Sequence, residues 1–252
     1  MQAACRIGVL VALALAAPAY AGDLNDDLLS VARQGDLTRV QALLSQGAIV
    51  DAHGDDYVTP LILAAQFDHA EVVRFLLARG ANVNFKSRLG ITALMSAARS
   101  GGLSTMQILL DHNADVDARN ANGSTALMRV AERGSEDLTK ALLQHGASVN
   151  LKDNLGRTAL MRAATNGHPQ VEELLLGGGA NVDEKSTAGW TACMLAAAGG
   201  HSDALEVLLA KGADVKATTN LGWTAEMFAA SKGNGRIVRR LREAAGVKVV
   251  RK

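Results

Sequence analysis

Residues 59–65 read TPLILAA, a threonine and a proline followed by five apolar residues. Modified copies return every 33 residues, as TALMSAA from residue 92, TALMRVA from 125, TALMRAA from 158, TACMLAA from 191 and TAEMFAA from 224. A threonine in this position predicts a helix N-cap, because its hydroxyl accepts a hydrogen bond from a free backbone N–H group. Proline is tolerated at the first helical position. The fixed period predicts a stack of repeated units rather than one globular core.

Glycines mark three further positions of the unit. Nine residues after the threonine stand Gly101, Gly134, Gly167, Gly200 and Gly233, with Asp68 as the exception. Twenty-one residues after it stand Gly80, Gly146, Gly179 and Gly212, with Asn113 and Ala245 as variants. Two residues before it stand Gly90, Gly123, Gly156, Gly189 and Gly222, with Tyr57 as the exception. Glycine permits the positive φ that ends a helix or forms a tight turn. Each unit is therefore predicted to hold two short helices, which are stable only when neighbouring units cover their apolar faces.

This pattern resembles the ankyrin-repeat family, whose repeat contains Thr-Pro-Leu-His-x-Ala-Ala. The family's Gly-His pair matches residues 167–168 and 200–201, and its closing Gly-Ala-x-Val-Asn matches residues 80–84 and 146–150. The resemblance covers residues 23–249 and implies an all-α solenoid of stacked helix–turn–helix units with β-turn or hairpin tips. It divides the chain into a capping repeat at 23–54, repeats at 55–87, 88–120, 121–153, 154–186 and 187–219, and a capping repeat at 220–249.

The terminal repeats depart from the pattern in ways that favour polar end caps. Asp26 stands at the threonine position of the first repeat, and Glu226 replaces the core leucine of the last. Solenoids need such caps to keep their terminal faces soluble.

Residues 1–21 are predicted to be a signal peptide. Arg6 precedes an apolar run at residues 7–17, which is too short to span a bilayer, and Ala19-Tyr20-Ala21 supplies a small-x-small cleavage site. Cleavage after Ala21 leaves Cys193 as the single cysteine, so the mature chain cannot form an internal disulfide. A thiol-poor exported chain fits a periplasmic location, with secretion as the alternative. Within the ankyrin family, a chain with such a signal peptide resembles the bacterial exported type.

The residues that suggest chemistry also have a packing explanation. Methionine recurs three residues after the threonine, at Met95, Met128, Met161, Met194 and Met227. A thioether row suits copper(I), but sulfurs one helix diameter, about 10 Å, apart cannot share an ion, so these methionines are expected to fill the core. His69, His168, His201 and Cys193 also follow the repeat register. We therefore expect no metal, no cofactor and no catalytic activity.

Partner-binding residues are expected on the tips and at the inner helix ends, where ankyrin proteins generally bind. These candidates are Phe67, Arg88, Leu89, Ile91, Arg99, Arg133, Leu155, Arg157, Trp190, Leu221 and Trp223. Trp190 and Trp223 are expected to stack side by side on consecutive tips. Aromatic side chains near arginine are typical of binding hot spots, although each indole could instead lie flat on a neighbouring turn and only stabilise the stack.

Charge is balanced overall but segregated between the ends. Residues 22–70 hold eight acidic and two basic side chains, whereas residues 221–252 hold eight basic and two acidic ones. The balance does not favour nucleic acid as a partner. The basic end suits either a solvated cap face or contact with an anionic membrane or acidic partner.

The function predicted is a non-catalytic protein-binding scaffold. Two alternatives are a periplasmic neutraliser of a toxin and an accessory protein in peroxide defence, the second by analogy with other exported ankyrin proteins. Deletion would be harmful only in the presence of the toxin in the first case, and only under oxidant in the second.

Overall fold

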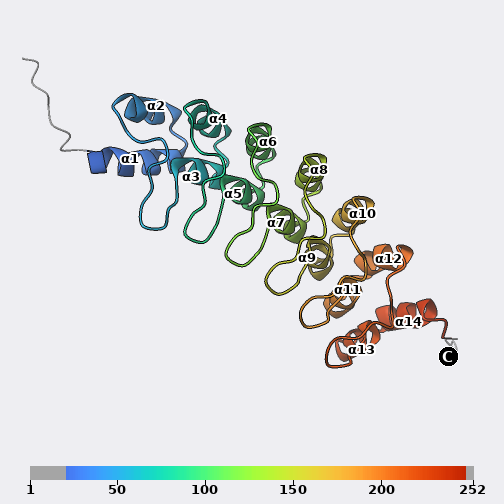
Figure 1. Cartoon of the computed structure of the whole chain (residues 1–252). Helices are drawn as coiled ribbons and strands as arrows, with labels where there is room; N and C mark the ends of the chain where they lie inside the picture. Colours follow the sequence, from blue (N-terminus) through green and yellow to red (C-terminus); the bar gives the residue numbers. More distant parts are fainter. Residues whose placement is uncertain (1–20, 248–252) are drawn as a thin grey trace, which may run out of the picture.

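The structure is a computed structural model that describes residues 21–247, and all regular secondary structure in this range is helical. One row of helices comprises α1 (Ala21–Gln34), α3 (Pro60–Gln66), α5 (Ala93–Ser100), α7 (Ala126–Arg133), α9 (Ala159–Asn166), α11 (Ala192–Gly199) and α13 (Ala225–Ser231). A second row comprises α2 (Leu37–Ser45), α4 (Ala70–Ala78), α6 (Leu103–Asp111), α8 (Glu136–Gln144), α10 (Pro169–Gly177), α12 (Ser202–Ala210) and α14 (Gly235–Ala244). Each helix packs on its predecessor and successor in its own row (Figure 1). The predicted all-α repeat solenoid is confirmed.

The threonines cap the first helix of each unit as predicted. The hydroxyls of all six accept a hydrogen bond from the backbone N–H group three residues later, at 3.3–3.4 Å. Pro60 occupies the first turn of α3. The first unit differs, because α1 runs through Asp26 without a break. Asp26 therefore lies inside a helix and is not an N-cap, unlike the threonine at the same position of the other repeats.

Left-handed residues occupy the predicted glycine positions at helix ends and in the tips, with one shift. Asp68, Asn113 and Tyr57 replace glycine and keep its positive φ, at 60°, 61° and 56°. Asp68 adds a bond of its own, since its carboxylate accepts a hydrogen bond from the Thr105 hydroxyl at 2.6 Å. In the last unit Ala245 remains right-handed and Gly246 has the positive φ of 77°. The assignment of Ala245 to the glycine position was wrong by one residue, because α14 is longer than the other second-row helices by one residue.

The core lies between the two rows of helices. Met95, Met128, Met161 and Met194 are buried in it, as the packing interpretation predicts. Met227 is 51% exposed and contradicts it, because no helix after α14 packs on α13 in residues 21–247. Within residues 21–247, none of the helices combines the length and the apolar character that a membrane crossing requires.

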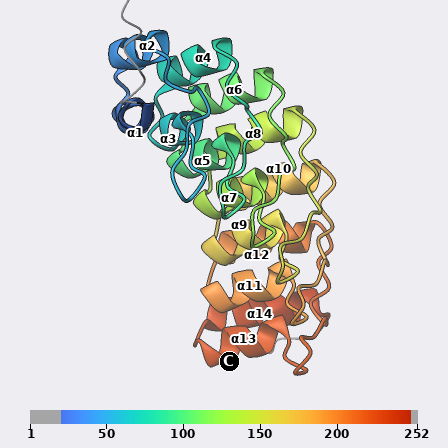
Figure 2. The ribbon, with the colours of Figure 1, turned by 60° about the vertical axis from the view of Figure 1, so that its left-hand side comes forward.

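The tips, defined as residues 53–58, 86–91, 119–124, 152–157, 185–190 and 218–223, project on one side of the first row (Figure 1). Main-chain hydrogen bonds join neighbouring tips at equivalent positions. The donor and acceptor pairs are Arg88 to Asp56, Ala121 to Leu89, Asn154 to Asn122, Thr187 to Leu155 and Asn220 to Ala188, at 2.8–3.1 Å. These bonds hold the tips in one continuous row, which keeps its order along the curved stack (Figure 2).

Histidines add a second link between repeats. The Nε2 atoms of His69, His168 and His201 lie 2.9–3.2 Å from backbone carbonyls of Arg33, Glu132 and Thr165 in the preceding repeat. A carbonyl only accepts, so Nε2 carries the proton in each case. The histidines thus have structural roles in the repeat register, as the sequence indicates.

Candidate partner-binding groove

An inner groove runs between the tips and the first row of helices. It consists of four hollows that share residues at their borders. Ser124 and Arg129 belong to the first and second hollows, Leu155 and Arg157 to the second and third, and Ala188 and Trp190 to the third and fourth. The groove is therefore continuous from the tip before α3 to the tip before α13. Its three regions differ in chemistry.

The first region, the aliphatic cleft, is formed by Val58, Ile62, Leu89, Ile91 and Met95. It has a volume of about 430 Å³, within the range of clefts that bind ligands. Arg88, Arg99 and Arg129 surround its apolar floor. The cleft can bury an aliphatic side chain and offers cationic groups beside it.

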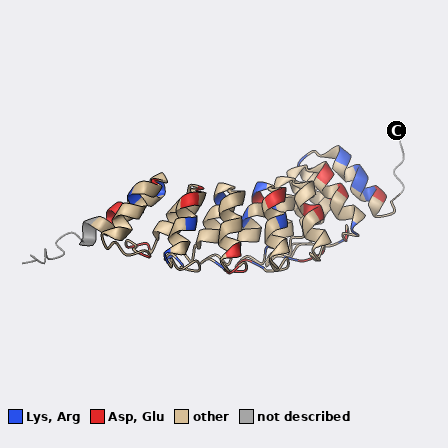
Figure 3. Cartoon of the chain, turned by 90° about the horizontal axis from the view of Figure 1, so that it is seen from above, with Lys and Arg blue, Asp and Glu red and all other residues tan. Residues whose placement is uncertain are grey.

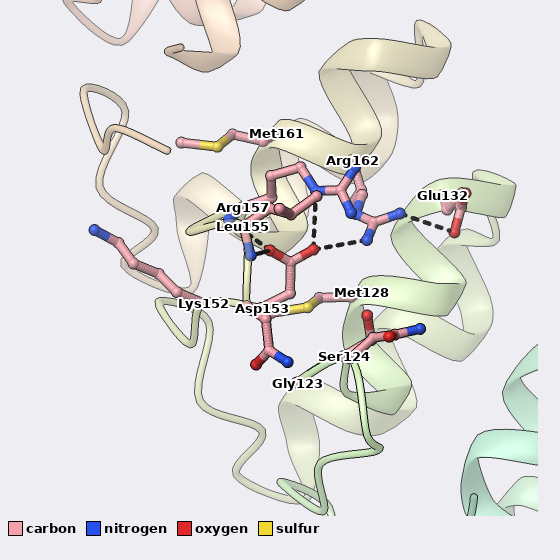
Figure 4. Close-up of polar contacts among 12 residues, drawn as sticks. Gly123, Ser124, Met128, Glu132, Lys152, Asp153, Leu155, Arg157, Met161 and Arg162 are labelled. Atoms are coloured by element: carbon pink, nitrogen blue, oxygen red, sulfur yellow. Dashed lines mark hydrogen bonds and ion pairs between the residues drawn. The ribbon is translucent and has the colours of Figure 1, made fainter. Parts of the chain in front are cut away.

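The second region, the arginine cluster, comprises Arg129, Arg157 and Arg162. Figure 4 shows Arg157 and Arg162 directed toward Asp153. Arg157 Nε and Arg162 Nη2 both donate to Asp153 Oδ2, at 2.9 and 2.8 Å. Arg162 Nη1 and Arg129 Nη1 each lie 3.4 Å from Glu132 Oε2. Three guanidinium groups are therefore held in place by two carboxylates, and the cluster keeps one net positive charge.

Asp153 organises this cluster because it is a tip residue with a second oxygen to spare. The corresponding residues of other tips, such as Ser87 and Ser186, accept one bond from the backbone N–H group four residues later. Asp153 Oδ1 does the same for Arg157 and also accepts from Leu155 N–H, which leaves Oδ2 for the arginines. Burial would raise the pKa of Asp153, but the bonds from Arg157 and Arg162 outweigh it and lower the pKa. The carboxylate is thus charged and fully bonded at neutral pH.

The third region, the aromatic patch, corrects one expectation about the tryptophans. Trp190 and Trp223 do not stack on each other, because Phe228 of α13 lies between them. The Phe228 ring centroid is 4.2 Å from that of Trp190 and 5.1 Å from that of Trp223. Trp190 is half-buried against the core, whereas Trp223 is 42% exposed. Trp190 therefore contributes to packing, and Trp223 offers the freer surface.

Nine of the eleven predicted binding residues line the inner groove. They are Arg88, Leu89, Ile91, Arg99, Leu155, Arg157, Trp190, Leu221 and Trp223. Phe67 and Arg133 are exposed but line none of the four hollows. The Arg33 guanidinium covers the Phe67 ring at 5.2 Å, and Arg133 donates to the Arg99 carbonyl at 2.8 Å. Both side chains make contacts between neighbouring repeats.

The groove residues four positions after the threonine were not predicted from the sequence. This row contains Ser96, Arg129, Arg162, Leu195 and Phe228, and all five line the hollows. Its members change from polar to cationic to apolar along the chain, unlike the uniform methionine row one position earlier. That variation at a fixed repeat position was the signal that could have identified the row.

The cysteine and the possible metal ligands do not form a second site in the described residues. Cys193 is buried, and its burial, followed by the charge of Asp183, raises the pKa of the thiol to about 12. In the part of the chain that the structure describes, no three His, Cys, Asp or Glu side chains are grouped as a metal site requires.

The basic residues of α14 lie at the C-terminal end of the stack (Figure 3). Arg240 Nε and Arg242 Nε lie 2.7 Å from carboxylates of Glu206 and Glu226. Two of the four arginines of this helix are thus paired within the protein, which supports the interpretation of a solvated end cap.

Comparison with known proteins gives one family. The family model described as ankyrin repeats (3 copies) matches residues 28–120, 112–186 and 169–252. A search among curated proteins finds no significant match.

Proposed function

Because the chain belongs to the ankyrin-repeat family, we propose that it is a non-catalytic scaffold that binds a segment of a partner protein in the inner groove. Ankyrin repeats are generally protein-binding scaffolds. The proposal goes further, since it assigns the binding to a particular surface of this chain.

One observation carries the proposal: three leucines project from the tips along the groove. Leu89, Leu155 and Leu221 are 66%, 55% and 86% exposed. Large apolar side chains in a row on a rigid surface are typical of interaction sites. The tips are already ordered by main-chain bonds, so binding there costs little ordering entropy.

The test compares the wild type with a Leu89→Ser and Leu155→Ser double variant in affinity capture from an extract of the source cells. Ile49→Ser is the matched control, because Ile49 is 60% exposed and lines none of the groove hollows. We expect a partner that both the wild type and Ile49→Ser retain and the double variant loses. Equal retention by all three proteins contradicts binding in the groove.

Capture variants should leave Trp190 intact. Its ring stacks on Phe228 and is half-buried, so a Trp190→Ala protein combines lost packing with lost recognition. Trp223→Ala is the cleaner aromatic substitution because its ring is more exposed.

The proposed location is the periplasm, after removal of residues 1–21. The support is the charged, apolar and small-residue order of this segment; residues 1–20 lie outside the described residues. The expected result is a periplasmic chain whose mass corresponds to residues 22–252. Replacing Ala19 and Ala21 by lysine should block processing. A full-length cytoplasmic chain from the unaltered gene would contradict export.

A further inference from the structure

We propose that the inner groove binds an extended peptide segment with an acidic side chain at its centre, paired with Arg157 and Arg129, and apolar side chains on both sides. This inference rests on the proposed function and specifies the chemistry of the partner. Three observations support it: the charge of the groove, the unused donors of the arginine cluster, and the order of the three regions.

The groove is strongly biased toward positive charge. Five arginines line its hollows, namely Arg88, Arg99, Arg129, Arg157 and Arg162, together with one acidic residue, Asp56. Asp153 is buried beneath the surface, and Glu132 is paired with two of the arginines. Including both carboxylates, the groove retains a net charge of +2, which favours an acidic partner.

The arginine cluster has donors that the protein does not use. Each guanidinium group carries five N–H donors. In residues 21–247, Arg157 uses Nε on Asp153 and Arg129 uses Nη1 on Glu132, and no bond engages Nη1 or Nη2 of Arg157. Both side chains are more than one-third exposed. The terminal nitrogens of Arg157 can therefore donate two hydrogen bonds to a carboxylate in bidentate geometry.

Asp153 prepares Arg157 for this contact. It holds Nε of the guanidinium group at 2.9 Å, which limits rotation of the side chain before any ligand arrives. An arginine that is already oriented loses less freedom on binding than a solvated one. The buried Asp153 carboxylate thus positions the cationic group.

The regions on both sides of the cluster favour a peptide over a polyanion. The aliphatic cleft lies on the N-terminal side, and the aromatic patch lies on the C-terminal side. A phosphate backbone would place charge along all three regions, whereas a peptide can alternate apolar and acidic side chains. The chemistry therefore favours an acidic peptide with apolar flanks.

Repeat geometry predicts the spacing in the partner. Packed helices lie about 10 Å apart, and an extended peptide advances about 3.3 Å per residue, so about three residues span one repeat. Ile91 and Arg157 occupy equivalent positions two repeats apart, and Trp190 is one repeat further along. The acidic residue should therefore lie about six residues from the aliphatic anchor and about three from the second apolar residue.

The test is selection of random peptides of about 16 residues on the full chain, displayed on phage. We expect enriched peptides to contain Asp or Glu about six residues from one apolar residue and about three from another on its opposite side. The order of these residues along the peptide depends on the direction in which the peptide lies in the groove. Arg129→Gln/Arg157→Gln should weaken their binding about tenfold or more. Arg74→Gln is the matched control, since Arg74 is an exposed arginine of the second row and pairs with Glu71.

A double-mutant cycle separates recognition from folding. Glu→Gln in a selected peptide should weaken binding to the wild type but have little effect on binding to the Arg129→Gln/Arg157→Gln variant. The affinity of the wild type should also fall with added salt more steeply than that of the variant. Equal effects of the peptide substitution on both proteins would overturn the proposed pairing.

The other outcomes identify which proposal fails. Selected peptides without acidic residues that still lose binding to Leu89→Ser/Leu155→Ser overturn the acidic partner and keep the groove function. Competition by inorganic phosphate as effective as that by the acidic peptide assigns the cluster to phosphate and overturns the carboxylate assignment. Selected peptides that bind the wild type and the Leu89→Ser/Leu155→Ser variant equally well contradict both proposals.

Discussion

Glu172 and Asp153 are both buried carboxylates, but their surroundings shift their pKa values in opposite directions. Asp153 is bonded at both oxygens, whereas both oxygens of Glu172 lack a hydrogen-bond partner in the described part of the chain. Burial therefore raises the pKa of Glu172 to about 8. The equivalent residues in the neighbouring repeats are Thr139 and Leu205, both of which are buried in the stack. Glu172 is thus an acid in a packing position.

Replacing Glu172 by leucine should stabilise the protein and change its pH dependence. The carboxyl group has an ordinary pKa of 4.5 in the unfolded chain and about 8 in the fold, so the folded state holds the extra proton between these values. The contribution of Glu172 to the free energy of unfolding is therefore greatest below pH 4.5. It falls as the pH rises to about 8 and is constant above that pH. At about 1.4 kcal/mol per pH unit, the loss reaches as much as ~5 kcal/mol.

Urea denaturation at several pH values measures this effect. In Glu172→Leu and Glu172→Gln, the free energy of unfolding should no longer decrease between pH 5 and 8. The control is Glu173→Gln, at the exposed neighbour in the same helix, which should keep this decrease. A wild-type stability that does not change across this pH range, relative to Glu172→Gln, would contradict the buried neutral acid.

Cys193 should be inert in the folded protein. Its pKa of about 12, raised by burial and then by the charges of Asp183, Asp214 and Glu172, leaves almost no thiolate at pH 8. A chain that starts at Gly22 should not react with a disulfide reagent in native buffer and should release one equivalent in urea. Rapid reaction in native buffer would show that the thiol is accessible.

At the scale of elements, the helices were more predictable than the contacts between side chains. The threonine and glycine positions are local requirements of caps and turns, so spacing alone located the ends of α3 to α13. Gly246 was missed because one added helical residue moves the turn without altering the earlier pattern. Phe228 was not predicted as the partner of both tryptophans. It belongs to the residues four positions after each threonine, and these line the groove only because the folded tips lie beside them. The Asp153 cluster was missed for the same reason: Arg162 belongs to α9 and reaches Asp153 only once the tip is folded beside that helix.

The tip row gives a prediction about two glycines at the same repeat position. A Cβ at Gly156 would lie 2.7 Å from the Thr187 backbone nitrogen, whereas a Cβ at Gly222 would meet nothing within 4 Å. Both have positive φ, 72° and 78°, so alanine costs about 1–2 kcal/mol of backbone strain at either position. Gly156→Ala should be more destabilising than Gly222→Ala, because it also displaces the bond from Thr187 to Leu155. Equal losses in urea denaturation would mean that the tips adapt to the extra atom.

At the scale of the whole molecule, we expect the last repeat to protect the stack from self-association. The final repeat covers α11 and α12, and Phe228 covers one face of Trp190. A chain that ends at residue 219 lacks α13 and α14 and leaves these apolar surfaces in water. It should bind a hydrophobic dye and associate in sedimentation experiments. A chain that ends at residue 247 is the control, and a truncated protein that behaves like this control would contradict the role of the last repeat as a cap.

The main-chain bonds between tips have an evolutionary consequence. Positions 56, 89, 122, 155 and 188 each supply the accepting backbone carbonyl, which any amino acid has. Their side chains can be exchanged one by one while the architecture persists. Divergence of ligand preference can therefore proceed in single mutational steps, without passing through unfolded intermediates.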